Sequence, residues 1–248
     1  MLYPDESSTT EHPLTRKGQE LRVWVRRLDV GVDGGHLLVF GSITDHCLVR
    51  IHSRCLYGDV LRSQDCDCGA ELDRTMDMIQ AEGNGVLIYL EQEGRGTGLT
   101  IKARGLHLTE ELGVDTFAAY EMLGEAPDRR CYATAAESIA TLGLSSVRLI
   151  TNNPEKVAAV RAAGVRVTKV PVHTLPESRR AARYLRAQRR HGGHRLPLHY
   201  RSRVVVPSLA TVVAVAGAVV AFAGFVLLGG FVAVAGIAIG LVGATGAA

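Results

Sequence analysis

The sequence predicts an α/β protein with a mixed β-sheet whose first strands are antiparallel, and three observations support this. β-rich runs alternate with helical patterns between about residues 20 and 172. The first two runs, 21–30 and 36–43, flank Gly-Val-Asp-Gly-Gly, which is a hairpin signal. Glycine-containing turns end two of the later helical patterns just before the next predicted strand.

The remaining elements follow in order. A strand over 46–53 leads into a cysteine-rich loop, and an amphipathic helix over 70–82 follows it. A short buried strand over 85–91 runs into a glycine-rich turn that opens the next helix. That helix runs through about residue 112, and the body closes with a helix over 131–142, a strand over 147–151, a helix over 154–163 and a strand over 165–170.

Charge is distributed unevenly along the chain. Nine of its 28 basic residues are arginines within 179–203, where there is no acidic residue. The other basic residues are outnumbered by the 25 acidic ones. The basic isoelectric point therefore belongs to one segment, and we predict no nucleic-acid partner.

Three cysteines follow the strand over 46–53 in a C-x10-C-x-C spacing. Cys55, Cys66 and Cys68 suit a tetrahedral zinc with one position left open, as a catalytic zinc requires. A closed structural site would need a fourth ligand, for which His52 is the nearest candidate, and three unligated cysteines are the other alternative.

The clustered cysteines also argue for a reducing compartment. The N-terminus is polar and has no apolar signal-peptide stretch. We expect residues 1–18 to be a flexible leader and the enzyme body to face the cytoplasm.

Two strand ends carry motifs suited to phosphate. Glu-Gly-Arg-Gly-Thr-Gly at 93–98 joins a strand to a helix, whose N-terminus favours an anion; Arg95 could hold phosphate and Glu93 a purine edge or a water. Thr-Asn-Asn-Pro-Glu-Lys at 151–156 repeats that design with Lys156. An ordinary glycine turn and an ordinary helix cap are the alternatives.

A series of motifs follows along the chain in this order: RIHSRC with DCDCG, QEGRGTGL, the Lys102/Arg104 helix, Asp115-Thr116, LGEAPDRR and TNNPEKV. Taken together, these motifs resemble the GTP cyclohydrolase II family. That family opens the guanine ring of GTP at the start of riboflavin biosynthesis. The likeness covers about residues 20–172. It implies a three-layer α/β/α body over 19–175, GTP as substrate, one Zn²⁺ per chain, Mg²⁺ on the triphosphate and a homodimer.

The resemblance also implies residue roles. Cys55, Cys66 and Cys68 would bind zinc, whose water attacks C8 of the purine. Asp128 would accept a proton, and Arg130 would be the nucleophile at the α-phosphate that expels pyrophosphate. From the residues alone, Asp128 and Arg130 could equally be a solvated surface pair. The implied nucleotide contacts are Arg50, Ile51, His52, Ser53, Arg54, Glu71, Glu93, Gly94, Arg95, Thr116, Thr151 and Lys156.

Several positions depart from the family pattern. Leu106 stands where the family has a tyrosine, so a hydroxyl that could polarise the opening ring is missing, although His107 is adjacent. We expect either the deformylated diaminopyrimidine nucleotide with formate, or a reaction that stops at the formylamino intermediate. Neutral drift and an altered purine preference are alternatives. The other departures are Arg54 for Glu, Asp65 for Arg, Glu71 for Gln, Tyr120 for Asn and Cys131 for Asp.

The last 45 residues contain no charged side chain. Each half of 204–248 is about as long as a bilayer-spanning helix requires. The arginine-rich linker over 176–203 would lie at the cytoplasmic surface, so we expect a two-span hydrophobic helical hairpin that anchors the enzyme at the inner face of the membrane. A buried or disordered appendage, or a reading-frame accident, is the alternative.

The competing function for the whole chain is a catalytically silent nucleotide-binding module tethered to a membrane.

Overall fold

The computed structural model describes residues 10–28 and 34–194. Within them the strands form one mixed, seven-stranded sheet in the order β1-β2-β3-β5-β4-β6-β7. The first three strands are antiparallel to their neighbours, whereas β5, β4, β6 and β7 are mutually parallel. The strands are β1 (His12–Arg16), β2 (Gln19–Leu28), β3 (Gly35–Phe40), β4 (Leu48–Ser53), β5 (Gly85–Leu90), β6 (Ser146–Ile150) and β7 (Arg166–Val170).

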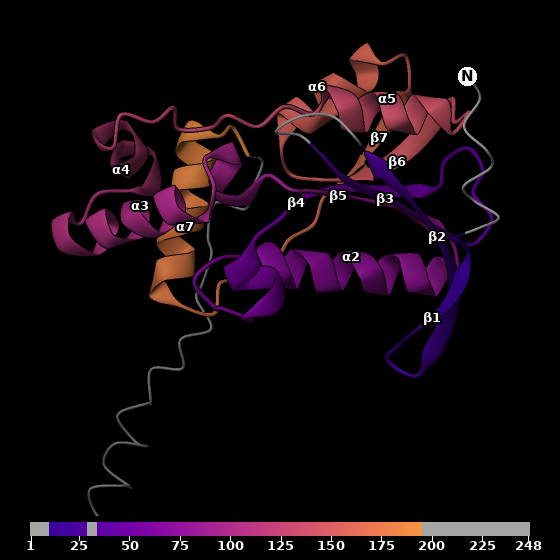
Figure 1. Cartoon of the computed structure of the whole chain (residues 1–248), viewed down its shortest axis with the longest axis horizontal. Coiled ribbons are helices and arrows are strands. Elements are labelled where there is room, and N and C mark those ends of the chain that lie inside the picture. Colours follow the sequence, from indigo (N-terminus) through magenta and orange to yellow (C-terminus); the bar gives the residue numbers. More distant parts are fainter. Residues whose placement is uncertain (1–9, 29–33, 195–248) are drawn as a thin grey trace, which may run out of the picture. The chain divides into compact units, whose positions relative to one another are not determined.

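Helices cover both faces of this sheet (Figure 1). Helix α2 (Cys68–Glu82) packs Met76 and Ile79 against one face, and α5 (Ala133–Thr141) and α6 (Pro154–Ala162) cover the other. Strands β4 and β5 are almost entirely buried, as parallel strands covered on both faces must be. The predicted α/β class, the mixed sheet and the antiparallel start of the sheet are confirmed.

Strand β1 lies inside the segment expected to be a leader. It pairs with β2 through a two-residue turn, Lys17-Gly18, in which both residues have positive φ. A turn of this type matches the strand twist, but its usual signal is Asn-Gly or Asp-Gly. Because Lys17 replaces that signal, the sequence does not reveal the hairpin. Pro13 is tolerated because β1 is an edge strand.

The remaining helices lie between β4 and α5 or after β7. Helix α4 (Thr116–Met122) begins after Asp115, whose carboxylate accepts hydrogen bonds from the backbone N–H groups of Phe117 and Ala118. A further helix lies within the predicted arginine-rich linker. These elements are η2 (Leu56–Val60), η3 (Glu93–Gly96), α3 (Leu99–Leu112), α4 (Thr116–Met122) and α7 (Arg179–His191).

The predicted membrane hairpin over 204–248 lies outside the described residues. Among the residues that the structure describes, no helix combines the length and the apolar character needed to cross a bilayer.

Candidate active site

The polar motifs meet at one edge of the sheet. Parallel strands β4, β5 and β6 end there, at Ser53, Leu90 and Ile150. The carboxyl ends of parallel strands are where open α/β sheets place their ligand sites. The motifs at 50–69, 92–98 and 151–156 are therefore brought together from distant parts of the chain.

The three predicted metal ligands form a compact cluster, hereafter the cysteine cluster. The sulfur atoms of Cys55, Cys66 and Cys68 all lie within 4.8 Å of one another, and those of Cys55 and Cys66 are 3.8 Å apart. All three are free thiols. Cys55 caps η2, where its sulfur accepts a hydrogen bond from the Gly58 backbone N–H at 3.3 Å, and Cys68 opens α2.

Two glycines allow the backbone segments of the cluster to approach each other. A Cβ atom on Gly69 would lie 2.1 Å from the carbonyl oxygen of Gly58. A Cβ atom on Gly58 would lie 3.0 Å from the sulfur of Cys66. The loop can hold its three sulfurs together because neither position carries a side chain.

The donor set fits zinc. Three thiolates are typical zinc ligands, and a fourth, open position is the arrangement of a catalytic site. The metal-ligand group that the described residues form holds only these three side chains. His52 is not part of it: its Nε2 contacts the Asp59 carboxylate at 3.1 Å. The described residues therefore do not form a closed metal site with His52 as the fourth ligand.

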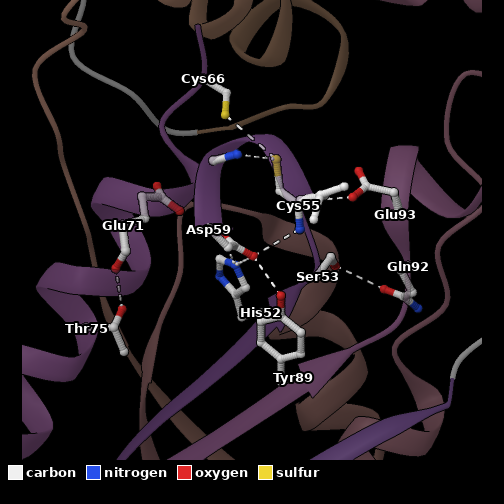
Figure 2. Close-up of polar contacts among 12 residues, drawn as sticks. His52, Ser53, Cys55, Asp59, Cys66, Glu71, Thr75, Tyr89, Gln92 and Glu93 are labelled. Carbon is white, nitrogen blue, oxygen red and sulfur yellow. Dashed lines mark hydrogen bonds and ion pairs between the residues drawn. The ribbon is translucent and has the colours of Figure 1, made fainter. Parts of the chain in front are cut away.

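Asp59 organises the loop (Figure 2). Its carboxylate accepts hydrogen bonds from the Cys55 backbone N–H at 3.0 Å and from the Tyr89 hydroxyl at 2.9 Å, besides the contact with His52. The side chains of His52 and Asp59 are 3% and 4% exposed. Burial lowers the pKa of His52, so the ring is neutral and holds the loop as a hydrogen-bonding group.

Lys102, for which the sequence suggested no role of its own, contacts the cysteine cluster. The ammonium group of Lys102 lies 3.1 Å from the sulfur of Cys55 and 2.8 Å from the Glu93 carboxylate. Hydrogen bonds from Cys66 and Cys68 lower the pKa of Cys55, and the charge of Lys102 adds to that effect. Although burial opposes it, the charge of Cys55 and the contact with Glu93 raise the pKa of Lys102. The cluster is thus poised to hold a thiolate.

The cysteine cluster opens into a cavity of about 110 Å³, hereafter the cysteine cavity. Leu106, Glu93 and Arg54 are among its lining residues. Arg54 also forms an exposed ion pair with Glu91 at 2.6 Å. His107 lies outside this lining and pairs with Glu111, so it does not replace a hydroxyl missing at Leu106.

Arg95 is held at the side of the cysteine cavity by aromatic rings. Its guanidinium carbon lies 3.9 Å from the ring centre of Phe117 and 5.5 Å from that of Tyr120. Its Nη2 donates a hydrogen bond to the Thr116 hydroxyl at 2.9 Å. Gly94 and Arg95 both have positive φ, which is unusual for arginine and consistent with a constrained functional turn.

A second cavity, about 60 Å³ in volume, lies beside a cluster of buried cations; it is hereafter the basic cavity. Arg50 pairs with the Glu71 carboxylate at 2.6 Å, and the Lys156 ammonium donates to the Ile51 carbonyl at 2.9 Å. Burial and the neighbouring arginines lower the pKa of Lys156. The lining residues include Arg50, His52, Ser53, Glu71, Arg130, Thr151 and Lys156.

Arg130 reaches the basic cavity in a two-pronged ion pair with Asp128. Its Nε and Nη2 lie 2.9 and 2.5 Å from the two carboxylate oxygens. The Arg130 side chain is only 12% exposed, so the pair is not the solvated surface pair considered above. Although burial opposes ionisation, the contact with Arg130 lowers the pKa of Asp128. The carboxylate is therefore charged at neutral pH.

All the predicted contact residues except Ile51 line one of the two cavities. Ile51 is fully buried and offers its carbonyl to Lys156. Thr151 accepts a hydrogen bond from the Asn153 backbone N–H at 3.0 Å, which shapes the turn before α6. Tyr184, on α7, lines both cavities and was not singled out from the sequence, because it lies among the arginines of the expected linker.

Comparisons with known proteins agree with this arrangement. A family model described as GTP cyclohydrolase II matches residues 6–171. A GTP cyclohydrolase-2 of Pseudomonas fluorescens (strain SBW25) is 50% identical over 141 residues, which are 56% of this chain and 68% of the relative. A GTP cyclohydrolase-2 of Neisseria gonorrhoeae is 45% identical over 160 residues, 63% of this chain and 80% of the relative. A riboflavin biosynthesis protein of Vibrio vulnificus is 49% identical over 138 residues, 54% of this chain and 37% of the relative.

Proposed function

Because the chain belongs to the GTP cyclohydrolase II family and is an enzyme of that type, we propose that it opens the imidazole ring of GTP at C8 and releases pyrophosphate. One observation carries the proposal beyond family membership. The three cysteine sulfurs converge at the edge of the sheet with no fourth side-chain ligand among the described residues, beside a cavity that Glu93, Arg95 and Arg130 also line.

Zinc held by Cys55, Cys66 and Cys68 would supply a Lewis acid that lowers the pKa of a bound water to about 7. We place the purine in the cysteine cavity, next to this site. Glu93 is fixed there by three contacts, from Lys102 and from the backbone N–H groups of Leu56 at 2.6 Å and Gly94 at 3.0 Å, so its carboxylate is positioned to accept hydrogen bonds from a purine edge. These residues would orient the base and its C8 atom.

We place the triphosphate at the basic cavity, with Mg²⁺ on the phosphates. Arg50, Arg130 and Lys156 line this cavity, and cations that converge in this way are suited to phosphate oxygens. The Nε atom of Arg50 is buried and has no hydrogen-bond partner among the described residues. Buried donors are normally satisfied, and a phosphate oxygen would satisfy this one.

Asp128 and Arg130 act at the α-phosphate in this proposal. Although burial opposes it, Tyr132 and Asp128 raise the pKa of Arg130, so the guanidinium binds phosphate as a cation. Attack by Arg130 on the α-phosphorus would form an N–P bond while the bond to the pyrophosphate leaving group breaks, and water would later cleave the N–P bond. The attack requires the loss of a guanidinium proton. The Asp128 carboxylate already contacts Nε and Nη2, and it is the acceptor for that proton.

The product depends on whether the formyl group leaves. Leu106 lines the cysteine cavity and offers no hydrogen-bond donor there. We propose that ring opening and pyrophosphate release proceed, while hydrolysis of the formamide is slow. The main product would be the formylamino-pyrimidine nucleotide rather than 2,5-diamino-6-ribosylamino-4(3H)-pyrimidinone 5′-phosphate with formate.

The remaining assignments are carried by family membership. We assign residues 19–175 to the catalytic domain and expect a homodimer. In place of the usual glutamine, Glu71 accepts from Arg50 and from Asn152, so it reduces the positive charge at the basic cavity. A panel of purine triphosphates would show whether this changes the preferred nucleotide.

Product identification tests the proposal. Full-length enzyme loaded with Zn²⁺ and Mg²⁺ is incubated with GTP, and the products are identified by mass spectrometry for the wild type and for Leu106→Tyr. We expect pyrophosphate from both, formylamino product from the wild type and more free formate from the variant. Stoichiometric formate from the wild type would refute the early stop, and absence of pyrophosphate would favour a silent nucleotide-binding module.

A further inference from the structure

Helix α7 borders the active site although it lies beyond the residues that the family model matches. Its Tyr184 lines the cysteine cavity and also the basic cavity. Gln188 and His194 line the basic cavity as well. One side chain of this helix therefore lies between the places proposed for the purine and for the phosphates.

We propose that α7 is a cap over the nucleotide site and that Tyr184 is the residue through which this cap contacts the nucleotide. The inference rests on the proposed function for the identity of the ligand, a guanine nucleotide. It goes beyond that function by giving substrate binding to a segment outside the matched region.

The Tyr184 hydroxyl is oriented for such a contact. Its oxygen accepts a hydrogen bond from the Gln188 side chain at 2.7 Å, and Gln188 is buried. The hydroxyl hydrogen has no acceptor within the described part of the chain, so it is available to a ligand oxygen or nitrogen. The Tyr184 ring lies 5.9 Å from the guanidinium carbon of Arg95, on which Phe117 and Tyr120 also pack.

The N-terminal end of α7 is attached to the loop between β4 and α2 that carries Cys55 and Cys66, hereafter the cysteine loop. The Ser178 hydroxyl, which caps α7, also donates to the Asp65 carboxylate at 3.2 Å. Arg180 lies 3.6 Å from Asp65 and 2.8 Å from Glu110. Asp65 immediately precedes Cys66, so docking of α7 is linked to the loop that carries the cysteine cluster. An arginine at position 65 would instead face Arg180.

The C-terminal end of α7 is attached to the elements that hold Arg95. His191 contacts the Asp115 carboxylate at 3.1 Å and stacks on Phe117 with ring centres 4.9 Å apart. Asp115 caps α4, and Phe117 is the ring nearest the Arg95 guanidinium. Both ends of α7 therefore contact residues adjacent to the proposed nucleotide contacts.

We expect the cap to move when substrate enters. The basic cavity of about 60 Å³ has room for roughly four or five waters, which is too little for a triphosphate. The ion pairs that hold α7 are solvent-exposed, and exposed pairs are screened and weak. These pairs can be released at little cost, and opening of α7 would also expose its buried face, formed by Ala181, Ala182, Leu185 and Gln188.

The first test compares Tyr184→Phe, Tyr184→Ala and Arg189→Ala in the zinc-loaded full chain. Arg189 is an exposed arginine of the same helix and lines neither cavity. We expect KM for GTP to rise about 3- to 10-fold in Tyr184→Phe, the loss of one hydrogen bond, and further in Tyr184→Ala. The zinc content of all three variants should be unchanged, and kcat of the Tyr184 variants should be less affected than KM. Arg189→Ala should behave like the wild type.

The second test measures hydrogen exchange of residues 179–191 with and without guanosine 5′-[α,β-methylene]triphosphate. We expect the nucleotide to slow exchange in α7, and Tyr184→Ala to abolish that protection. This readout needs no turnover, so it tests the cap even if GTP is not hydrolysed. A KM for Tyr184→Phe within twofold of the wild type, or exchange in α7 that does not respond to the nucleotide, would overturn the proposal.

Discussion

The cysteine loop and helix α7 border the same cavities but are held in opposite ways. In the loop, Asp59 binds His52, Tyr89 and the backbone of Cys55, and the side chains of Asp59 and His52 are almost fully buried. Helix α7 buries a face of small and apolar residues, but the polar contacts at its ends are ion pairs whose members are largely exposed, such as Arg180 and Glu110 at 56% and 62%. Buried polar networks are rigid when satisfied, whereas exposed pairs contribute about 0–1 kcal/mol each.

The difference between a buried network in the loop and exposed pairs on α7 matches two different tasks at the same site. The loop holds three sulfurs in place before any ligand arrives, and chemistry at a metal requires such fixed geometry. The helix supplies contacts that must be released whenever nucleotide enters or leaves. A change in the loop should therefore alter stability and metal binding together, while a change in α7 should alter nucleotide affinity and local opening.

The largest effect is expected where the loop has no spare room. In Gly69→Ala the new methyl group would lie 2.1 Å from the Gly58 carbonyl oxygen, so backbone must shift. We expect the free energy of unfolding to fall by about 3 kcal/mol and zinc affinity to fall about 10- to 100-fold. Chemical denaturation and chelator competition measure the two quantities.

Gly105→Ala is the matched control for stability. Gly105 is inside α3, and a Cβ atom there would meet nothing closer than 3.7 Å. Alanine is favoured over glycine in a helix, so we expect this variant to be unchanged or more stable by up to about 1 kcal/mol. Equal destabilisation of both variants would mean that the close approach of Gly58 and Gly69 is not what constrains the loop.

A smaller effect is expected from acid at α7. Burial, together with the charges of Arg130 and Lys156, lowers the pKa of His194 from 6.5 to about 4. A state with α7 undocked binds more protons between these values, so docking is complete above pH 6.5 and weakens as pH falls toward 4. Between pH 7 and pH 5 docking should weaken by about 2 kcal/mol, from 1.36 kcal/mol per pKa unit.

Hydrogen exchange of residues 179–191, corrected for the intrinsic pH dependence, measures this opening. Exchange should accelerate from pH 7 to pH 5 in the wild type, and much less in His194→Gln. The same response in both proteins would assign the acid sensitivity to other groups near the basic cavity, such as Glu71.

The sequence was informative where chemistry and local pattern coincide. The spacing of Cys55, Cys66 and Cys68 predicted the cluster, and the alternation of strands and helices predicted the sheet. The function of Asp59 could not be predicted, because nothing local distinguishes it from neighbouring aspartates and its partner Tyr89 lies thirty residues away. The contact of Lys102 with Cys55 likewise depends on how α3 packs on the loop.

Helix α7 was not predicted from the sequence because of its composition. Its arginines suggested a linker, but they occupy the outer face, while Ala181, Ala182, Leu185 and Gln188 form the buried one. Helical spacing of small and apolar residues was the signal that could have revealed it. Its position over the site is a tertiary property, set by contacts with Asp65 and Asp115.

Three thiols that hold one zinc ion beside the nucleotide site are the basis of the proposed reaction. Mass spectrometry of the native full-length chain, with iodoacetamide labelling before and after a chelator, tests it directly. The account predicts one zinc per chain, rapid labelling of the exposed Cys131 only, and labelling of Cys55, Cys66 and Cys68 once the metal is removed. A chain without zinc whose three cluster cysteines react as fast as Cys131 before chelation would contradict it.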